Sequence, residues 1–170
     1  CAFPTSKNAI AKSAPEISNL PIIISDGVDQ ISLRVFTRPE SPKIANLAEL
    51  NGKTVALWNG LDPKLLFRGR NIKIETTPSE LVRVKMLDAH RIDAILGFTP
   101  DVILAAQQLD LPEPHFDNKL ALFRDEGASI VCKDSPQNRA FIKEFNTILK
   151  QLKTSGRLQK ILGPHVELAP

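Results

Sequence analysis

Cysteine and long apolar runs are both scarce in this chain of 170 residues. No apolar run approaches the roughly 20 residues that a membrane-spanning helix needs, so no span is expected within these residues. Two cysteines, Cys1 and Cys132, are too few for a disulfide framework or a zinc site. Cys132 lies in an apolar run, which favours a buried inert thiol. Cys1 has a second interpretation as the lipidated first residue of a mature lipoprotein.

An excess of charge of one sign is also lacking. The chain has 22 Lys and Arg residues against 19 Asp and Glu, a formal net charge of +3. Its basic stretches, such as 68–70, have no interleaved aromatic residue, so nucleic-acid binding is not expected. There is no glycine-rich phosphate loop. His90, His115 and His165 lack metal-site spacing or a paired nucleophile, so neither catalysis, a metal nor a cofactor is expected.

Four dipeptides pair a helix-capping residue with proline directly after a strand-like run. A capping side chain accepts a hydrogen bond from a free helical N–H, and proline at the first helical position has no N–H to leave unpaired. The repeated order of strand, cap and helix predicts an α/β fold with a parallel sheet, in which ligands bind at the edge where strands end and helices begin. The dipeptides are Asp62-Pro63, Thr77-Pro78, Thr99-Pro100 and Ser135-Pro136.

Alternation of apolar and polar residues predicts the remaining elements. Residues 30–37 are expected to form an exposed or crossing strand, and a short helix is expected over 46–50. In the last third, apolar residues at helical spacing from Phe141 to Leu152 predict one amphipathic helix, and Gly156 suits the position after its end. The other expected strands are 53–58, 71–75, 92–97, 118–123 and 127–132, and the other expected helices are 62–68, 78–89, 100–109 and a short one near 158–162.

The apolar residues of the terminal helices exceed what residues 1–35 can cover. The chain also opens on Cys1-Ala2-Phe3-Pro4, which resembles the end of a strand. Part of a lobe is therefore expected upstream of residue 1.

Several segments, in the right order, resemble a known family. Residues 45–60 (ANLAELNGKTVALWNG) resemble the L-x-x-L-x-G-K-x-V-x-V-x-x-G segment of periplasmic solute-binding proteins with the type II fold, in particular those for polar amino acids. Residues 81–97 resemble their L-x-x-G-R-x-D-A segment, and 144–165 their closing helices. More loosely, 1–10 and 17–22 resemble the D-A-x-x-x-x-x-x-T-x-x-R and F-S-x-P stretches.

The resemblance implies two α/β lobes joined by two crossing strands that close like a hinge on a small solute. Residues 1–35 and 131–170 would form an incomplete lobe one, and 36–130 would form the inserted lobe two. The crossing strands would be 30–37 and 127–133.

For lobe one, the resemblance implies ligand contacts from the loop after the first strand. Thr5, Ser6 and Lys7 take the place of the family's small hydroxyls and backbone amides. Lys12 stands where the family has an arginine that binds the substrate carboxylate through two hydrogen bonds. The lysine ammonium is a point charge and lacks the planar guanidinium that makes such a pair. The alternative for each of these residues is a solvated surface side chain that does not contact a ligand.

For lobe two, the resemblance implies contacts after the first strand. Asn59, Gly60 and Asp62 occupy the place of the family's Gly-Thr or Gly-Ser, and the family's hydroxyl is replaced by Leu61. Asp62 is explained as a helix cap, and as a ligand contact it would favour a cationic or hydroxylated solute. Trp58, the only tryptophan, ends the strand and belongs either to the core or to the pocket.

Phe98 stands where the family places the carboxylate that receives the substrate ammonium. An aromatic side chain can stack on a ring or cover a cation but cannot pair as a carboxylate does. Asp93 is expected to be structural, while Thr99 and Asp101 at the next helix start remain possible polar contacts. These departures argue against an α-amino acid as the ligand.

The expected function is therefore that of a periplasmic solute-binding protein that captures a small polar or aromatic molecule by hinge closure for an ABC-type transporter. One alternative is a ligand-sensing module of a signalling protein. A less favoured alternative is an enzyme of the same fold, such as a dehydratase. The expected partners are a small solute and a membrane permease or sensor.

Overall fold

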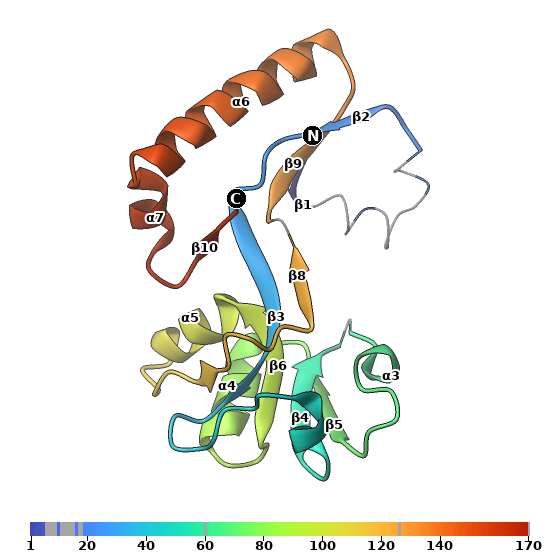
Figure 1. Ribbon diagram of the computed structural model, residues 1–170, viewed down its shortest axis with the longest axis vertical. Helices are drawn as coiled ribbons and strands as arrows, with labels where there is room; N and C mark the ends of the chain where they lie inside the picture. The colour runs from blue at the N-terminus through green and yellow to red at the C-terminus, as the bar shows by residue number, and fades with distance from the viewer. Residues whose placement is uncertain (6–9, 11–15, 17–18, 60, 126, 170) are drawn as a thin grey trace. The chain divides into compact units, whose positions relative to one another are not determined.

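The computed structural model describes all residues except 6–9, 11–15, 17–18, 60, 126 and 170. The chain divides into two compact units (Figure 1). Unit 1 comprises Cys1–Ile31 and Arg124–Pro170, and unit 2 comprises Ser32–Phe123. Each boundary lies a few residues earlier in the chain than the expected 35/36 and 130/131.

Unit 2 is built on a sheet with strand order β3-β6-β4-β5. Strands β4 (Thr54–Trp58), β5 (Lys73–Thr77) and β6 (Ala94–Thr99) run parallel, with Val55 opposite both Ile74 and Ala94. β3 (Asp29–Thr37) pairs antiparallel with β6. The predicted parallel α/β arrangement is confirmed here, because the three strands alternate with helices along the chain.

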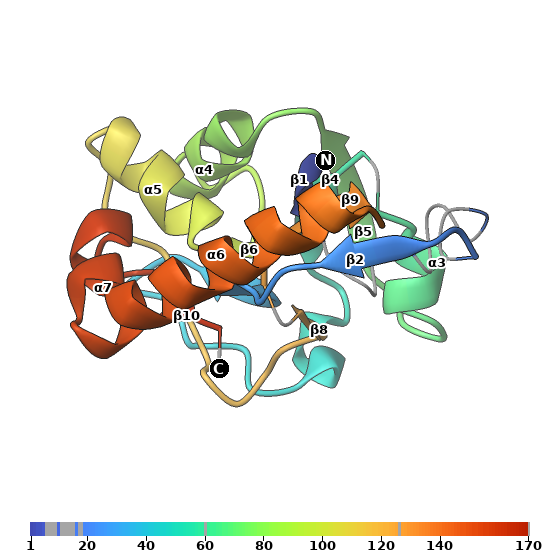
Figure 2. The ribbon, with the colours of Figure 1, turned by 90° about the horizontal axis from the view of Figure 1, so that it is seen from above.

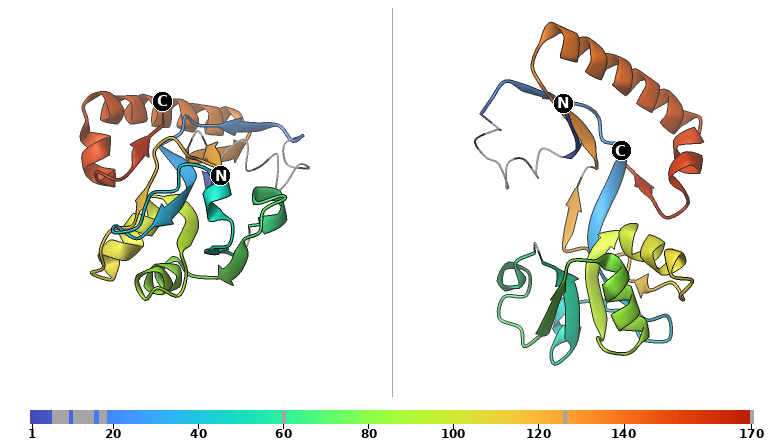
Figure 3. Two further views of the ribbon diagram at one scale, coloured as in Figure 1. Left: turned by 60° about the horizontal axis from the view of Figure 1, so that its bottom comes forward. Right: turned by 180° about the vertical axis from the view of Figure 1, so that it is seen from behind.

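Helices cover both faces of this sheet, and each face carries its own apolar cluster. One face, which we call the α4/α5 face, packs Ala56 and Ile95 against α4 (Glu80–Asp88) and α5 (Asp101–Gln108). The ribbons of these two helices lie on the same side of the sheet (Figure 3). The other, the α3 face, packs Leu57 and Leu96 against the residues around the 3₁₀ helix η1 (Leu47–Leu50) and α3 (Pro63–Leu66). Successive strand residues alternate between these two faces.

The cap and proline dipeptides mark all four helix starts, but only two cap as predicted. Asp62 Oδ1 accepts from the Lys64 N–H at 2.9 Å, and Ser135 Oγ accepts from the Asn138 N–H at 3.2 Å. Thr77 and Thr99 are wrong as caps because each is still the last residue of its strand. α4 and α5 begin with no side-chain cap bond.

Of the two alternatives for this strand, exposed or crossing, the crossing one holds: β3 runs from unit 1 into unit 2, and its residues 32–37 in unit 2 are buried. Even Arg34 is only 2% exposed. Its guanidinium lies 4.8 Å from the Phe116 ring and donates to the carbonyl oxygens of Asn118 and Leu120. These bonds hold residues 118–122 in the connection between β7 (His115–Phe116) and β8 (Phe123–Asp125). The strand expected over 118–123 is therefore limited to its last residue, Phe123, which begins β8.

Unit 1 contains a three-stranded antiparallel sheet of order β1-β9-β2. β9 (Ser129–Lys133) lies between β1 (Ala2–Thr5) and β2 (Ile22–Ile24). The prediction that 127–133 crosses between the lobes is wrong, since β9 pairs wholly inside unit 1. The chain returns from unit 2 through β8 instead, which spans the 123/124 boundary.

The long helix α6 (Pro136–Thr154) packs on β2 and β9 (Figure 2). Gly156 follows it with φ 68°, the left-handed conformation expected of a residue after a helix end. α7 (Arg157–Leu162) and β10 (Glu167–Leu168) complete the unit, and β10 pairs with the first residues of β3.

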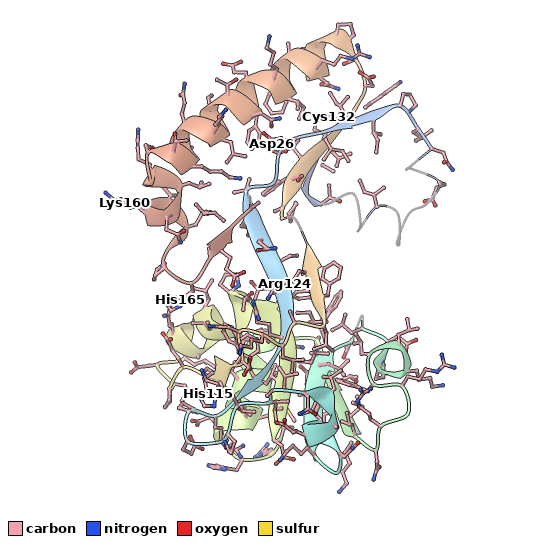
Figure 4. All side chains as sticks on the ribbon, in the orientation of Figure 1. Asp26, His115, Arg124, Cys132, Lys160 and His165 are labelled. Carbon is pink, nitrogen blue, oxygen red and sulfur yellow. A yellow bond between two sulfur atoms is a disulfide. The ribbon has the colours of Figure 1, made fainter. Side chains whose placement is uncertain are left out.

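A disulfide joins Cys1 to Cys132, and it overturns both expectations for these cysteines. Because Ala2 lies opposite Val131 in the β1–β9 pair, the two sulfurs meet at the adjacent position. Figure 4 labels Cys132 on β9. Cys132 is therefore not an inert thiol, and the Cys1 sulfur used in this bond is not available for a lipid thioether.

Candidate functional site

The candidate site in unit 2 is the edge of the sheet where its three parallel strands end. β4 ends at Trp58 and β5 at Thr77, which lie opposite each other, and β6 ends at Thr99. Helices α3, α4 and α5 begin just beyond these three strand ends. Ligands of open parallel sheets bind at such an edge, because loops and helix N-termini gather there.

Trp58 is a surface residue of this edge, with 49% of its area exposed. Its neighbour Leu57 belongs to the apolar cluster of the α3 face, so alternation turns Trp58 toward the α4/α5 face. The core alternative for this tryptophan is therefore wrong. A large, half-exposed aromatic ring at a sheet edge offers a stacking surface for a ligand.

Phe98 lies on the other face of the same sheet. It packs, partly buried, against the cluster of the α3 face that includes Leu96. Because Trp58 and Phe98 point to opposite faces, they do not form a single aromatic clamp. Position 98 therefore carries an aromatic ring and no carboxylate.

The polar candidates in unit 2 have local hydrogen-bonding roles. Asp62 is exposed and caps α3. Thr99 is buried and its Oγ1 donates to the Ser32 carbonyl oxygen at 3.4 Å. Asp93 Oδ2 accepts from the Thr54 N–H at 2.7 Å, which gives it the expected structural role at the opposite end of β4. Asn59 is exposed beside Trp58.

A partly buried ion pair beside the end of β5 was not predicted from the sequence. Arg83, 3% exposed, donates from Nη1 to the carbonyl oxygen of Thr77 at 3.0 Å and to its Oγ1 at 3.3 Å. Its Nε and Nη2 donate to the two carboxylate oxygens of Glu80. The signal available in the sequence was the three-residue spacing of Glu80 and Arg83 at a helix start.

Gly97 makes room for this pair. A Cβ atom at position 97 would lie 2.4 Å from Val102 Cγ2 and 3.1 Å from Glu80 Oε1. Any larger residue would therefore push against α5 and against the Glu80 carboxylate. The α4/α5 side of the edge thus combines Trp58, Thr77, Thr99 and a neutralised Glu80–Arg83 pair.

The candidates of unit 1 are mostly outside the described residues. Thr5 ends β1, partly buried, opposite Ser129. Ser6, Lys7 and Lys12, like Gly60 of unit 2, are not among the residues described. Their proposed contacts with a ligand stay predictions.

The described histidines and acidic residues do not gather into a metal site. His115, labelled in Figure 4, is hydrogen-bonded through Nε2 with the Ser41 carbonyl oxygen at 2.7 Å. His90 is exposed after α4. No cluster of three or more His, Cys, Asp or Glu residues suited to a metal ion occurs within the described part of the chain. Across that same part, every helix is too short or too polar to cross a bilayer.

Comparisons with known proteins define the class of fold. No family model and no curated protein matches the chain. Among solved structures, it is similar to the second substrate-binding domain of a putative amino acid ABC transporter from Streptococcus pneumoniae. That match has a TM-score of 0.64 and 23% identity, and it covers 83% of this chain and 63% of that one.

Two further matches are a ligand-binding core and a sensor domain. The GluR0 ligand-binding core complexed with L-glutamate has a TM-score of 0.66 and 13% identity, with 94% of this chain and 69% of that one covered. A histidine kinase sensor domain similar to periplasmic binding proteins has a TM-score of 0.55 and 18% identity, with 86% and 64% covered.

The chain thus has the type II periplasmic-binding fold, as the sequence resemblance predicted. It spans about 63% of the length of the Streptococcus pneumoniae domain.

Proposed function

We propose that this chain belongs to a solute-binding protein that captures a small polar or aromatic molecule at the strand-end edge of unit 2. The observation that carries the proposal is Trp58, half exposed beside Thr77 where the parallel strands end. Thr5, Ser6, Lys7 and Lys12 of unit 1 would complete the site when the two units close by a hinge motion. Delivery of the solute to an ABC-type permease is the proposed role.

The charges at the edge favour a ligand other than a simple α-amino acid. Phe98 takes the place of the carboxylate that binds an ammonium group in the family that the sequence resembles. The Glu80 carboxylate on the Trp58 side already pairs with Arg83. A ring that stacks on Trp58 and hydroxyl or carbonyl groups that hydrogen-bond to exposed backbone match this edge better than a zwitterion does.

Two observations support the proposed setting. The Cys1–Cys132 disulfide suits an oxidising compartment such as the periplasm. The similar structures are named as binding or sensor domains, which supports binding without turnover. The similarity to a histidine kinase sensor domain keeps a sensing role as the second candidate.

Binding is tested by titrating the protein with amino acids, amines and aromatic acids while following Trp58 fluorescence. Trp58 is the only tryptophan, so a change in the intrinsic fluorescence reports binding at this edge without a label. We expect a saturable change with an aromatic or hydroxylated solute and a rise in melting temperature. The variant Trp58→Ala should lose that thermal shift, whereas Lys85→Ala, an exposed change on α4, should keep it.

Two results would count against the proposal. If no member of the panel changes the fluorescence or the melting temperature, the edge is not a solute site. If a simple α-amino acid stabilises the protein strongly, the reasoning from Phe98 and Glu80 is wrong.

A further inference from the structure

Unit 2 also has a groove lined by residues outside the proposed solute site. It has a volume of about 390 Å³ and is lined by residues of α3, of the loop that follows it and of β5. Figure 1 shows α3 beside β5, the last strand of the sheet. Its apolar lining is Pro63, Phe67, Ile72 and Ile74. Nothing in the proposed solute-binding function uses these residues.

The polar part of the groove is wholly cationic. Gly69 and the side chains of Lys64, Arg68 and Arg70 complete the lining. The three cationic residues are all exposed, and no carboxylate lines the groove with them. Arg70 Nη1 donates to the Arg68 carbonyl oxygen at 3.3 Å, and within the described residues none of the three has an acidic partner. Three unpaired cations around an apolar floor create a local positive potential that attracts an anionic group.

The two nearest acids in the chain do not neutralise this potential. Asp62 does not line the groove, and its Oδ1 accepts from the Lys64 backbone N–H as the cap of α3. Glu75 alternates to the sheet face opposite that of Ile74.

The groove adjoins an open strand edge. β5 is the last strand in the sheet order, so among the described residues its outer side has no partner strand. The Lys73 N–H donates to the Lys53 carbonyl oxygen at 2.9 Å and so faces the inner side toward β4. Alternation then turns the backbone groups of Ile74 and Thr76 outward, and the Ile74 side chain lines the groove.

We propose that β5 and this groove dock an extended acidic segment of a partner polypeptide. The segment would add as a strand along β5, place an apolar side chain on Phe67 and Ile72, and bring carboxylates to Arg68 and Arg70. Strand addition supplies affinity through main-chain hydrogen bonds and specificity through the pockets alongside. The outward N–H and C=O groups of β5 favour a polypeptide, because a lipid headgroup offers no backbone ladder.

A second copy of this chain does not suit the same edge. Pairing two β5 edges would bring two sets of Lys64, Arg68 and Arg70 together, and like charges at close range oppose association. The charge of the groove therefore selects a partner of opposite sign.

The test uses the 170-residue protein and a fluorescein-labelled heptapeptide that alternates glutamate and leucine, read by fluorescence anisotropy. We expect saturable binding that weakens as NaCl is raised, because exposed ion pairs are screened by salt. The double variant Arg68→Glu, Arg70→Glu should weaken binding by at least about tenfold, the loss expected when attraction becomes repulsion at two contacts. The neutral pair Arg68→Gln, Arg70→Gln provides a second reading if the charge reversal disturbs folding.

Two controls separate this site from general charge effects. Lys119→Glu reverses the charge of one exposed lysine near the β3 end of the sheet and should leave the affinity unchanged. A peptide N-methylated at alternate residues should bind poorly, because it cannot form the strand ladder.

The proposal is overturned by any of three results. The peptide fails to bind, or it binds equally well to the Arg68 and Arg70 variants, or N-methylation leaves its affinity unchanged. Binding of phosphatidylglycerol vesicles that depends on Arg68 and Arg70, without peptide binding, would instead identify a membrane-facing patch.

Discussion

The two units of this chain are stabilised in different ways. Unit 2 contains 19 of the 26 apolar residues that are buried among those described, and both apolar clusters lie within it. Unit 1 buries 7 and adds the disulfide between β1 and β9. A parallel sheet covered on both faces supplies its own core, whereas a short three-stranded sheet with helices on one side depends more on a covalent link.

The long helix of unit 1 carries exposed apolar residues. Phe141 and Ile148 of α6 are 46% and 48% exposed, although they belong to the apolar stripe that the sequence pattern identified.

The largest expected effect is the loss of the disulfide. Cys132→Ser should lower the stability of unit 1 by about 3–5 kcal/mol, because the unfolded chain is released from a loop of 131 residues. Hydrogen exchange should then quicken at β9 and β1 and stay slow at β4 and β6. Equal acceleration in both units would contradict the contrast drawn here.

A core substitution in unit 2 should have the opposite effect, with faster amide exchange in unit 2 than in unit 1. Leu57→Ala removes a fully buried side chain and should cost about 2–5 kcal/mol. The exchange of β4 and β6 amides measures the loss. The matched change Leu149→Ala on α6 should cost less, because neighbouring apolar residues there are already exposed. A larger loss at Leu149 would reverse the ranking of the two cores.

Breaking the Glu80–Arg83 pair should be costly on the α4/α5 face. Arg83→Met removes the donors to Thr77 and Glu80 from a buried position, at an expected cost of about 2 kcal/mol. Urea denaturation measures it. Because Glu80 is then left without its cation, the second change Glu80→Gln should recover part of the loss. No recovery would mean that the two side chains are not energetically coupled.

The cap of α3 should have a smaller effect. Asp62→Ala should cost about 1 kcal/mol, since one helical N–H loses its acceptor, and Asp62→Asn should be nearly neutral. Thermal denaturation compares the two. If Asp62→Asn also abolishes the solute-induced thermal shift, Asp62 contacts the ligand in addition to capping the helix.

The smallest expected effect is a pH dependence in unit 1. Arg139 donates to Asp134, with Nη2–Oδ2 at 2.6 Å, and this hydrogen bond holds the pKa of Asp134 below its usual value. A lowered pKa in the folded state gives a contribution that is present above the usual pKa and disappears as the pH falls through the folded value. Arg139→Gln should therefore be slightly less stable than the parent at pH 7 and equal to it at acidic pH. A difference that persists in acid would assign the effect to packing.

The sequence predicted most of unit 2 because its signals are local. The capping residues, prolines and short apolar runs each act within a few residues, and they locate β4, β6, α3 and α5 to within about two residues. The Asp62 and Ser135 caps follow from the same reasoning. The type II fold followed from the order of these segments.

The features that were missed depend on residues far apart in the chain. Nothing near Cys132 indicates that residue 1 pairs opposite it, and nothing near Arg34 indicates that carbonyl groups at 118 and 120 surround it. The Thr77 and Thr99 caps were wrong because strand pairing continues to the residue before proline. Which face of the sheet Trp58 and Phe98 occupy could be assigned only once the register of the strands was known.

The measurement that tests the proposed site most directly is an amide and indole NMR titration of the ¹⁵N-labelled protein with the solute that most raises the melting temperature. The account predicts shifts of the Trp58 indole and of the amides of Asn59, Gly97 and Thr99, with Lys43 and Lys119 unmoved. Shifts confined to residues outside the strand-end edge would contradict it.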